Sequence, residues 1–164
     1  MSTTEAIEVV NLARAFNIPS ILPAAFYVCS RLSPKVLMEG IVYPDGRRSV
    51  LSPADLLRCW NGQQELDRRY AVALQDLRNV IAGDFCEDED ECSEAKKNHD
   101  EKEMCSTMGC CLASTSWLDE DLADEVTLCD CCTEARVSSW KEFRSDTWNA
   151  LPEIFDLKDA NEAS

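Results

Sequence analysis

Cysteines are concentrated in the second half of the sequence, and two pairs of them have spacings that suit a metal site. Ten cysteines occur in 164 residues, and eight of them follow residue 83. Cys129 and Cys132 form a C-x2-C pair, in which a tight backbone bend lets two thiolates point at one ion. Cys86 and Cys92 form a looser C-x5-C pair. Because a tetrahedral site needs four ligands, the two pairs together predict one structural zinc ion, with Cys131 pointing away from it.

Two other interpretations of the cysteines stay open from the spacing alone. Cysteine is among the residue types most often buried, and Cys29 and Cys59 lie on apolar helical stripes, so we expect both in the core. A redox pair at Cys129 and Cys132 would make the chain a thiol oxidoreductase. Such pairs usually open a helix after a strand, and the sequence shows no strand–helix alternation. Three further cysteines lack a paired motif and are spare thiols or alternate ligands: Cys105, Cys110 and Cys111.

Net charge divides the chain into two unlike halves. Residues 1–83 hold 8 acidic and 9 basic residues, whereas residues 84–164 hold 23 acidic and 7 basic residues. The net charge of −15 repels nucleic-acid phosphates and favours basic protein partners. Neither a long apolar run nor a basic N-terminal segment occurs, so we expect no membrane span and no signal peptide. Reduced thiols then fit a cytoplasmic or nuclear protein.

Apolar residues recur at helical spacing and predict an all-α, irregular multi-helix domain. The domain is expected to contain a Cys-rich acidic insertion that a bound zinc ion stabilises. We expect helices over residues 4–16, 20–32, 34–39, 53–61, 63–82 and 133–151. Serines at 20, 33 and 52 are expected to cap three of them, glycines at 40 and 62 to end two, and YPDG to form a turn. The expected core includes Val10, Phe16, Leu22, Phe26, Leu57, Tyr70, Leu77, Trp140 and Phe143.

Composition predicts three parts along the chain. Residues 1–83 form a helical region, residues 84–132 an acidic Cys-rich insertion, and residues 133–164 a C-terminal helix that packs back on the core. Residues 87–103 are expected to be mobile, because so polar a segment cannot offset the entropy of ordering it.

Motifs for catalysis are missing from the sequence. It contains no Gly-rich phosphate loop, no G-x-S-x-G elbow and no H-E-x-x-H. His99, the single histidine, lies in the acidic run, where we expect a solvated side chain rather than half of a Cys–His dyad. We therefore expect no catalytic or cofactor-binding residues and a chain that is not an enzyme.

Residues 9–32 contain Leu-Ala-Arg, an aromatic residue, Ile-Pro-Ser and Leu-Pro-Ala-Ala followed by a second aromatic residue. This pattern resembles the region that overlaps and follows the last helices of the BTB/POZ domain in fungal, mostly basidiomycete, proteins. Three later segments are similar to the same family: LSPADLLRCWNGQQEL, LCDCCTEA and WNALPEIFDL. The matching residues of the first segment are Leu12-Ala13-Arg14, Phe16, Ile18-Pro19-Ser20, Leu22-Pro23-Ala24-Ala25 and Phe26.

This resemblance implies a non-enzymatic protein–protein interaction module with adaptor or assembly roles, with ubiquitin-ligase components among its partners in whole members. It also implies that the outer cysteine pairs stand where the family places its own. The strands and early helices of the BTB domain are missing, so we expect a truncated member or a stand-alone C-terminal half, and the family's dimer surface is not carried over. Asp156 stands where the family often has Gly. The alternative function is a zinc-stabilised nuclear regulatory protein that acts through protein contacts.

Overall fold

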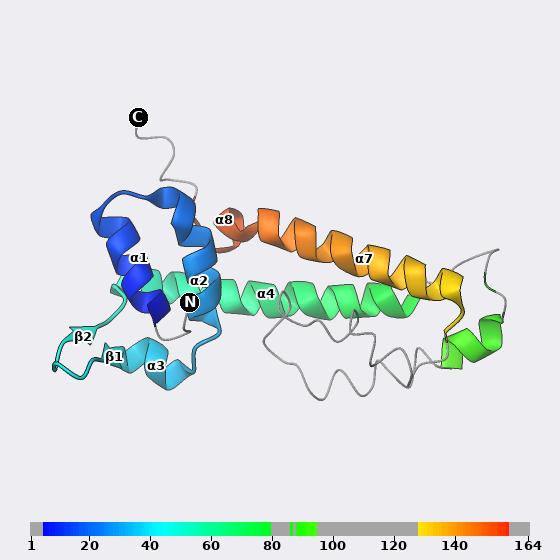
Figure 1. Ribbon diagram of the computed structural model, residues 1–164, viewed down its shortest axis with the longest axis horizontal. Helices are drawn as coiled ribbons and strands as arrows, with labels where there is room; N and C mark the ends of the chain where they lie inside the picture. The colour runs from blue at the N-terminus through cyan, green and yellow to red at the C-terminus, as the bar shows by residue number, and fades with distance from the viewer. Residues whose placement is uncertain (1–4, 80–85, 87, 95–127, 158–164) are drawn as a thin grey trace. The chain divides into compact units, whose positions relative to one another are not determined.

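The computed structural model describes residues 5–79, 86, 88–94 and 128–157 (Figure 1). Within these ranges it is helical apart from one small hairpin, so the all-α class is confirmed. The elements are α1 (Ala6–Ala15), the 3-10 helix η2 (Pro19–Ile21), α2 (Leu22–Ser30), α3 (Pro34–Glu39), β1 (Ile41–Val42), β2 (Arg48–Ser49), α4 (Pro53–Asn79), α7 (Asp130–Asn149) and α8 (Leu151–Ile154). Residues 89–94 are helical as well. Among the described residues, no helix combines the length and apolar character needed to cross a membrane.

The chain packs as two compact units. The terminal unit comprises residues 1–66 and 149–164, and the central unit comprises residues 67–148. This division in space falls inside α4, whereas the three parts predicted from composition meet at residues 83 and 132. The difference arises because packing follows contacts between helices, and α4 is one continuous helix across the change of unit.

Helix α1 packs against α2 in the terminal unit (Figure 1). Its buried residues, Ala6, Ile7, Val10 and Ala13, recur at helical spacing and form one face. Asn17 follows the C-cap of α1 and turns the chain away from the helix, with a φ of 51° in the left-handed region that asparagine tolerates. The Ile18 N–H then donates to the Ala13 carbonyl at 2.8 Å, and the Asn17 N–H to the Arg14 carbonyl at 3.3 Å. These two bonds make a Schellman motif, so α1 ends before the proline that follows.

Helix α8 ends in the same way. Asp156 has a φ of 52°, and the Leu157 N–H donates to the Pro152 carbonyl at 2.8 Å. Glycine is the residue best suited to this left-handed position, because it has no Cβ to clash with the backbone. Aspartate is among the few other residues that tolerate it.

The structure confirms the predicted helix caps at Ser33 and Ser52 and the predicted turn at YPDG. The cap predicted at Ser20 was wrong. The Ser33 hydroxyl accepts a hydrogen bond from the Val36 N–H at 3.4 Å, and α3 then ends at Gly40, whose φ is 76°. The YPDG turn joins β1 to β2, and within it the Gly46 N–H donates to the Tyr43 carbonyl at 2.9 Å. Ser20 caps nothing, because η2 precedes α2 and leads the chain directly into it.

A buried carboxylate, Asp55, ties α1 to the start of α4. Its backbone N–H donates to the Ser52 hydroxyl at 3.1 Å, which confirms the predicted cap, and that hydroxyl donates back to the carboxylate at 2.9 Å. Arg14 and Arg58 contact the same carboxylate at 2.8 and 3.3 Å. Asp55 is only 5% exposed, so these donors are needed to replace the water that a buried charge loses.

Gly62 lies inside α4, and the prediction that it ends a helix was wrong. A Cβ at this position would overlap the ring of Phe155, which is fully buried and stacks on Phe26 with the ring centroids 5.6 Å apart. The glycine therefore serves close packing between α4 and the end of α8. The helix continues because neither a proline nor a left-handed residue interrupts it.

Two residues of the expected core are exposed, Phe16 at 70% and Leu57 at 59%. Phe16 is the C-cap of α1, where the chain already turns away from the helix. On α4 the buried positions are 55, 59, 62, 66, 70, 73 and 74, so Leu57 projects from the opposite side. Five expected core residues are buried, Val10, Leu22, Phe26, Tyr70 and Trp140; Phe143 is half-buried, and the side chain of Leu77 lies outside the described part.

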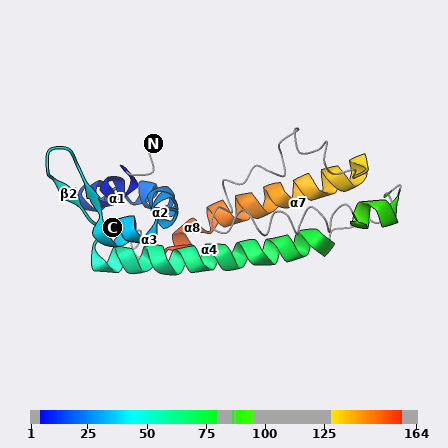
Figure 2. The same cartoon turned by 90° about the horizontal axis from the view of Figure 1, so that it is seen from below.

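The described core of the central unit forms where α4 and α7 run side by side (Figure 2). Tyr70 of α4 meets Trp140 of α7 edge-on, with the ring centroids 5.9 Å apart. Trp140 also contacts Phe143 one turn along α7, at 5.1 Å. Helix α7 begins at Asp130 and ends at Asn149, slightly earlier at both ends than the helix predicted over residues 133–151.

Replacing Gly62 with Ala tests the contact with Phe155. In an ordinary helix interior this change is stabilising, because alanine loses less conformational freedom on folding. Here we expect it to lower the free energy of unfolding by about 1–3 kcal/mol through overpacking, as measured by chemical denaturation. Asn61→Ala, at the exposed neighbouring position, is the matched control.

Shrinking the partner ring should relieve the overlap. The cost of Gly62→Ala should therefore be smaller in a Phe155→Leu background than in the wild-type protein. Equal costs in the two backgrounds would show that Gly62 and Phe155 do not pack against each other.

Candidate metal centre

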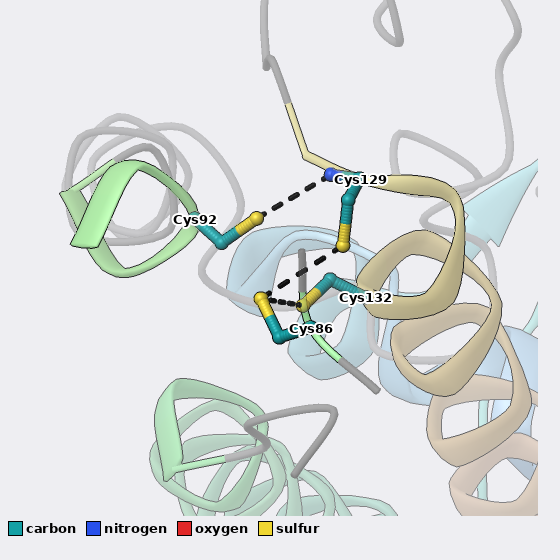
Figure 3. Close-up of side chains that lie close together, drawn as sticks. All are labelled: Cys86, Cys92, Cys129 and Cys132. Atoms are coloured by element: carbon teal, nitrogen blue, oxygen red, sulfur yellow. Dashed lines mark hydrogen bonds between the residues drawn. The ribbon is translucent and has the colours of Figure 1, made fainter. Parts of the chain in front are cut away.

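The four cysteines predicted as zinc ligands lie together in the central unit (Figure 3). The sulfurs of Cys86, Cys92, Cys129 and Cys132 are all within 4.8 Å of one another. The Cys86 sulfur is 3.9 Å from that of Cys129 and 3.5 Å from that of Cys132. Figure 3 shows the four side chains pointing toward one another, with Cys129 and Cys132 at the start of α7, Cys92 on the helix of residues 89–94 and Cys86 on the segment before it.

These separations fit a tetrahedral ion. A zinc–sulfur distance of about 2.3 Å sets neighbouring sulfurs at the corners of a tetrahedron roughly 3.8 Å apart. The two measured distances fall on either side of that value. A disulfide would need bonded sulfurs at about 2 Å, and the described cysteines are all free thiols.

The start of α7 positions two of the ligands. Cys129 directly precedes the helix and Cys132 lies in its first turn, which the Thr133 N–H begins by donating to the Cys129 carbonyl at 3.0 Å. The first turn of a helix presents unpaired N–H groups and a partial positive charge, and both favour thiolates. Cys131, between the two, is exposed, as expected of a residue that is not a ligand.

A short helix in the acidic run positions Cys92. The Asp88 carboxylate accepts a hydrogen bond from the Glu91 N–H at 2.9 Å, and the Asp88 carbonyl accepts one from the Cys92 N–H at 3.1 Å. Asp88 is thus an N-cap with a glutamate three residues later, a capping pattern visible in the sequence. The segment 87–103, expected to be mobile, contains a helix at residues 89–94, whereas residue 87 and residues 95–103 lie outside the described residues.

Burial differs among the four thiols. Cys132 and Cys92 are 1% and 3% exposed, whereas Cys86 and Cys129 are half-buried. The Cys129 N–H also donates to the Cys92 sulfur at 3.4 Å, a bond that stabilises a thiolate. The site is therefore largely shielded from water, with one backbone donor aimed at a ligand sulfur.

The pKa values of two thiols in the cluster are raised in the absence of a cation. Desolvation, together with the hydrogen bond between the two thiols of Cys86 and Cys132, raises the pKa of Cys86 to about 12. The backbone N–H of Cys129 lowers the pKa of Cys92, but desolvation and the thiols of Cys129 and Cys132 outweigh it and the pKa is raised. A bound cation would supply the charge that ionises these thiols.

The other cysteines fall outside this cluster. Cys29 and Cys59 are fully buried in the terminal unit, as expected of core residues, and a hydrogen bond with Cys29 and burial raise the pKa of Cys59. The remaining titratable residues singled out from the sequence lie outside the described residues: His99, Cys105, Cys110 and Cys111.

Comparison of the chain with protein-family models, with curated proteins and with solved structures gave no match. The functional interpretation therefore depends on the geometry of this site and on the surfaces of the two units.

Replacing Cys132 with Ser should abolish stoichiometric zinc binding. A serine hydroxyl is a poor zinc ligand, and three remaining thiolates leave the tetrahedron open. Elemental analysis should show about one zinc per wild-type chain and a large loss in the variant, together with a lower melting temperature. Cys131→Ser is the matched control, because Cys131 lies on the same turn but is exposed. Equal zinc content in Cys132→Ser and the wild type would exclude the site.

The pH dependence of stability should have opposite signs with and without zinc. In the metal-free protein, the pKa of Cys86 is raised from an ordinary value of 9.0 to about 12, so its stabilising contribution is present below pH 9 and lost as the pH rises toward 12. Zinc-bound thiolates carry no protons, whereas unfolded thiols do below about pH 9. The zinc-loaded protein should therefore gain stability between about pH 6 and 8.

Denaturation at fixed free zinc, repeated across pH, measures this difference. Calorimetric titration with zinc should also release about four protons per ion as the thiols ionise. Parallel pH profiles for the two forms, with no proton release, would contradict binding through these thiols.

Proposed function

We propose that this chain is a non-enzymatic protein–protein interaction module whose central unit is stabilised by one structural zinc ion. The convergence of the four sulfurs of Cys86, Cys92, Cys129 and Cys132, at separations that suit a zinc tetrahedron, carries the zinc assignment. Four cysteine ligands complete the coordination of the ion, and a closed site of this kind is structural rather than catalytic.

A structural ion would stabilise the central unit, whose described apolar core is small. Besides cysteine, its buried apolar side chains in the described part are Tyr70, Ala73, Leu74 and Trp140. So small a core offsets little of the entropy lost on ordering the chain. Binding of structural zinc is worth about 10–16 kcal/mol in zinc-finger peptides, and this energy becomes folding energy when the site forms only in the folded state.

The terminal unit supplies apolar surface for a partner. Leu12 of α1 is 49% exposed, and Phe16, the C-cap of the same helix, is 70% exposed. Ile18 and Ile21, which follow them in the chain, are 41% and 43% exposed. Four large apolar side chains exposed within residues 12–21 exceed the scattered single exposures that are normal on a soluble protein, so this stretch is the candidate for a protein contact.

The resemblance of residues 9–32 to the region after the BTB/POZ domain adds independent support for an adaptor role, since this stretch contains the same exposed residues. Ubiquitin-ligase components are therefore the first partners to test. The net charge of −15 favours basic partners over nucleic acids.

Quantitative affinity purification of the full chain tests the adaptor role. We expect Leu12→Ser/Phe16→Ser to lose captured ubiquitin-ligase subunits while keeping the zinc content and the melting temperature of the wild type, because both side chains are exposed. Ala15→Ser, also exposed on α1, should capture what the wild type captures. An unchanged set of captured proteins in the double variant would rule out this surface as the adaptor interface.

A further inference from the structure

The central unit contains an open groove of about 510 Å³ between α4 and α7. Its apolar lining comes from Val72 and Ala73 of α4 and from Phe143 of α7. Val72 is 46% exposed, and Phe143 is half-buried, so part of this lining faces solvent.

Three carboxylates also line the groove: Asp76 of α4, and Glu142 and Asp146 one turn apart on α7. All three are exposed, and none has a side-chain hydrogen bond or ion pair with another residue of the described part. Arg68 and Arg69, which line the groove as well, each already have an interaction. The lining therefore holds three carboxylates and two guanidinium groups, and its carboxylates are the charged groups without a partner in the described part.

We propose that this groove binds an amphipathic helix of a partner protein that presents apolar side chains flanked by lysine or arginine. The inference rests on the proposed adaptor function and names the chemistry of one partner. Two helices that run side by side leave a groove into which a third helix packs, as in helical bundles and helix-in-groove recognition. The apolar side chains would contact Val72, Ala73 and Phe143, and the cations would pair with the three carboxylates.

The negative charge of the central unit disfavours two other occupants of the groove, a second copy of the unit and residues 95–127 of the same chain. Residues 67–148 hold 21 acidic and 9 basic residues, so a second copy of the unit would bring like charge to the groove. Residues 95–127 of the same chain hold 8 acidic and 3 basic residues and match the three carboxylates poorly. A basic helix has the opposite charge to the rim and would also be steered toward it over a distance.

The probe for this groove is a synthetic amphipathic helix of leucine and lysine, about 14 residues and four turns long. The zinc-loaded full chain is titrated with it and followed by NMR. We expect the largest shift changes at Val72, Ala73 and Phe143. A peptide of the same pattern with glutamate in place of lysine should bind at least about tenfold more weakly, because its charge is like that of the rim.

A matched pair of variants separates the groove from general attraction to an acidic protein. Glu142→Gln/Asp146→Asn should weaken binding of the lysine peptide by about fivefold. Ser138→Lys/Ser145→Lys changes the net charge by the same amount at exposed positions of α7 outside the groove, and should weaken it by less than about twofold.

Four results would overturn the proposal. Equal weakening by the two variants, with shifts spread over residues 88–94, would indicate attraction to the overall charge alone. Equal binding of the glutamate peptide would exclude a role for the carboxylates. Shifts of the groove residues with protein concentration, in the absence of peptide, would assign the groove to a second copy. Zinc content is measured on the same samples: one ion per chain without binding in the groove contradicts this inference alone, whereas absence of zinc contradicts the proposed zinc site.

Discussion

The close packing of Phe155 on Gly62 is the contact on which the terminal unit depends. It brings the end of the described chain back to α4, beside Phe26 of α2, and it leaves no room for a side chain at position 62. The chain leaves this unit after Leu66 and returns to it at Asn149, so the central unit is inserted along the chain between two stretches of the terminal unit. Such an insertion needs contacts of its own to offset the entropy lost on ordering it.

The cysteine cluster supplies such contacts, and it does so against an electrostatic cost. A zinc ion with four thiolates carries a net charge of −2, and residues 88–94 add five carboxylates close to Cys92. Part of this repulsion is offset by the first turn of α7, whose positive end lies at Cys129 and Cys132, and by the backbone N–H that donates to the Cys92 sulfur. The remaining negative charge is exposed and suits a basic partner.

The two units offer a partner different chemistry. On the terminal unit, four large apolar side chains are exposed between Leu12 and Ile21. On the central unit, the groove between α4 and α7 combines a small apolar lining with carboxylates. Helix α7 contributes one of the candidate zinc ligands, Cys132, and one side of the groove, and Cys129 directly precedes the helix. Loss of a bound ion would therefore disturb the groove proposed to bind a basic helix, and the ion would support that interaction without contacting the partner.

The sequence by itself determined the helical class, the caps at Ser33 and Ser52, the YPDG turn and the identity of four candidate ligands, because local spacing and short-range hydrogen bonds decide each of these. It could also have revealed the helix at 89–94 through Asp88 and Glu91, but the acidic composition outweighed that local signal. Only the tertiary structure decided that Gly62 continues a helix, since the reason is a ring from the other end of the chain. It also decided which side of each helix is buried, and so exposed Phe16 and Leu57. The tertiary structure likewise decided that the two cysteine pairs meet. Spacing along the sequence fixes the distance between the cysteines of one pair, whereas the fold fixes the distance between the two pairs.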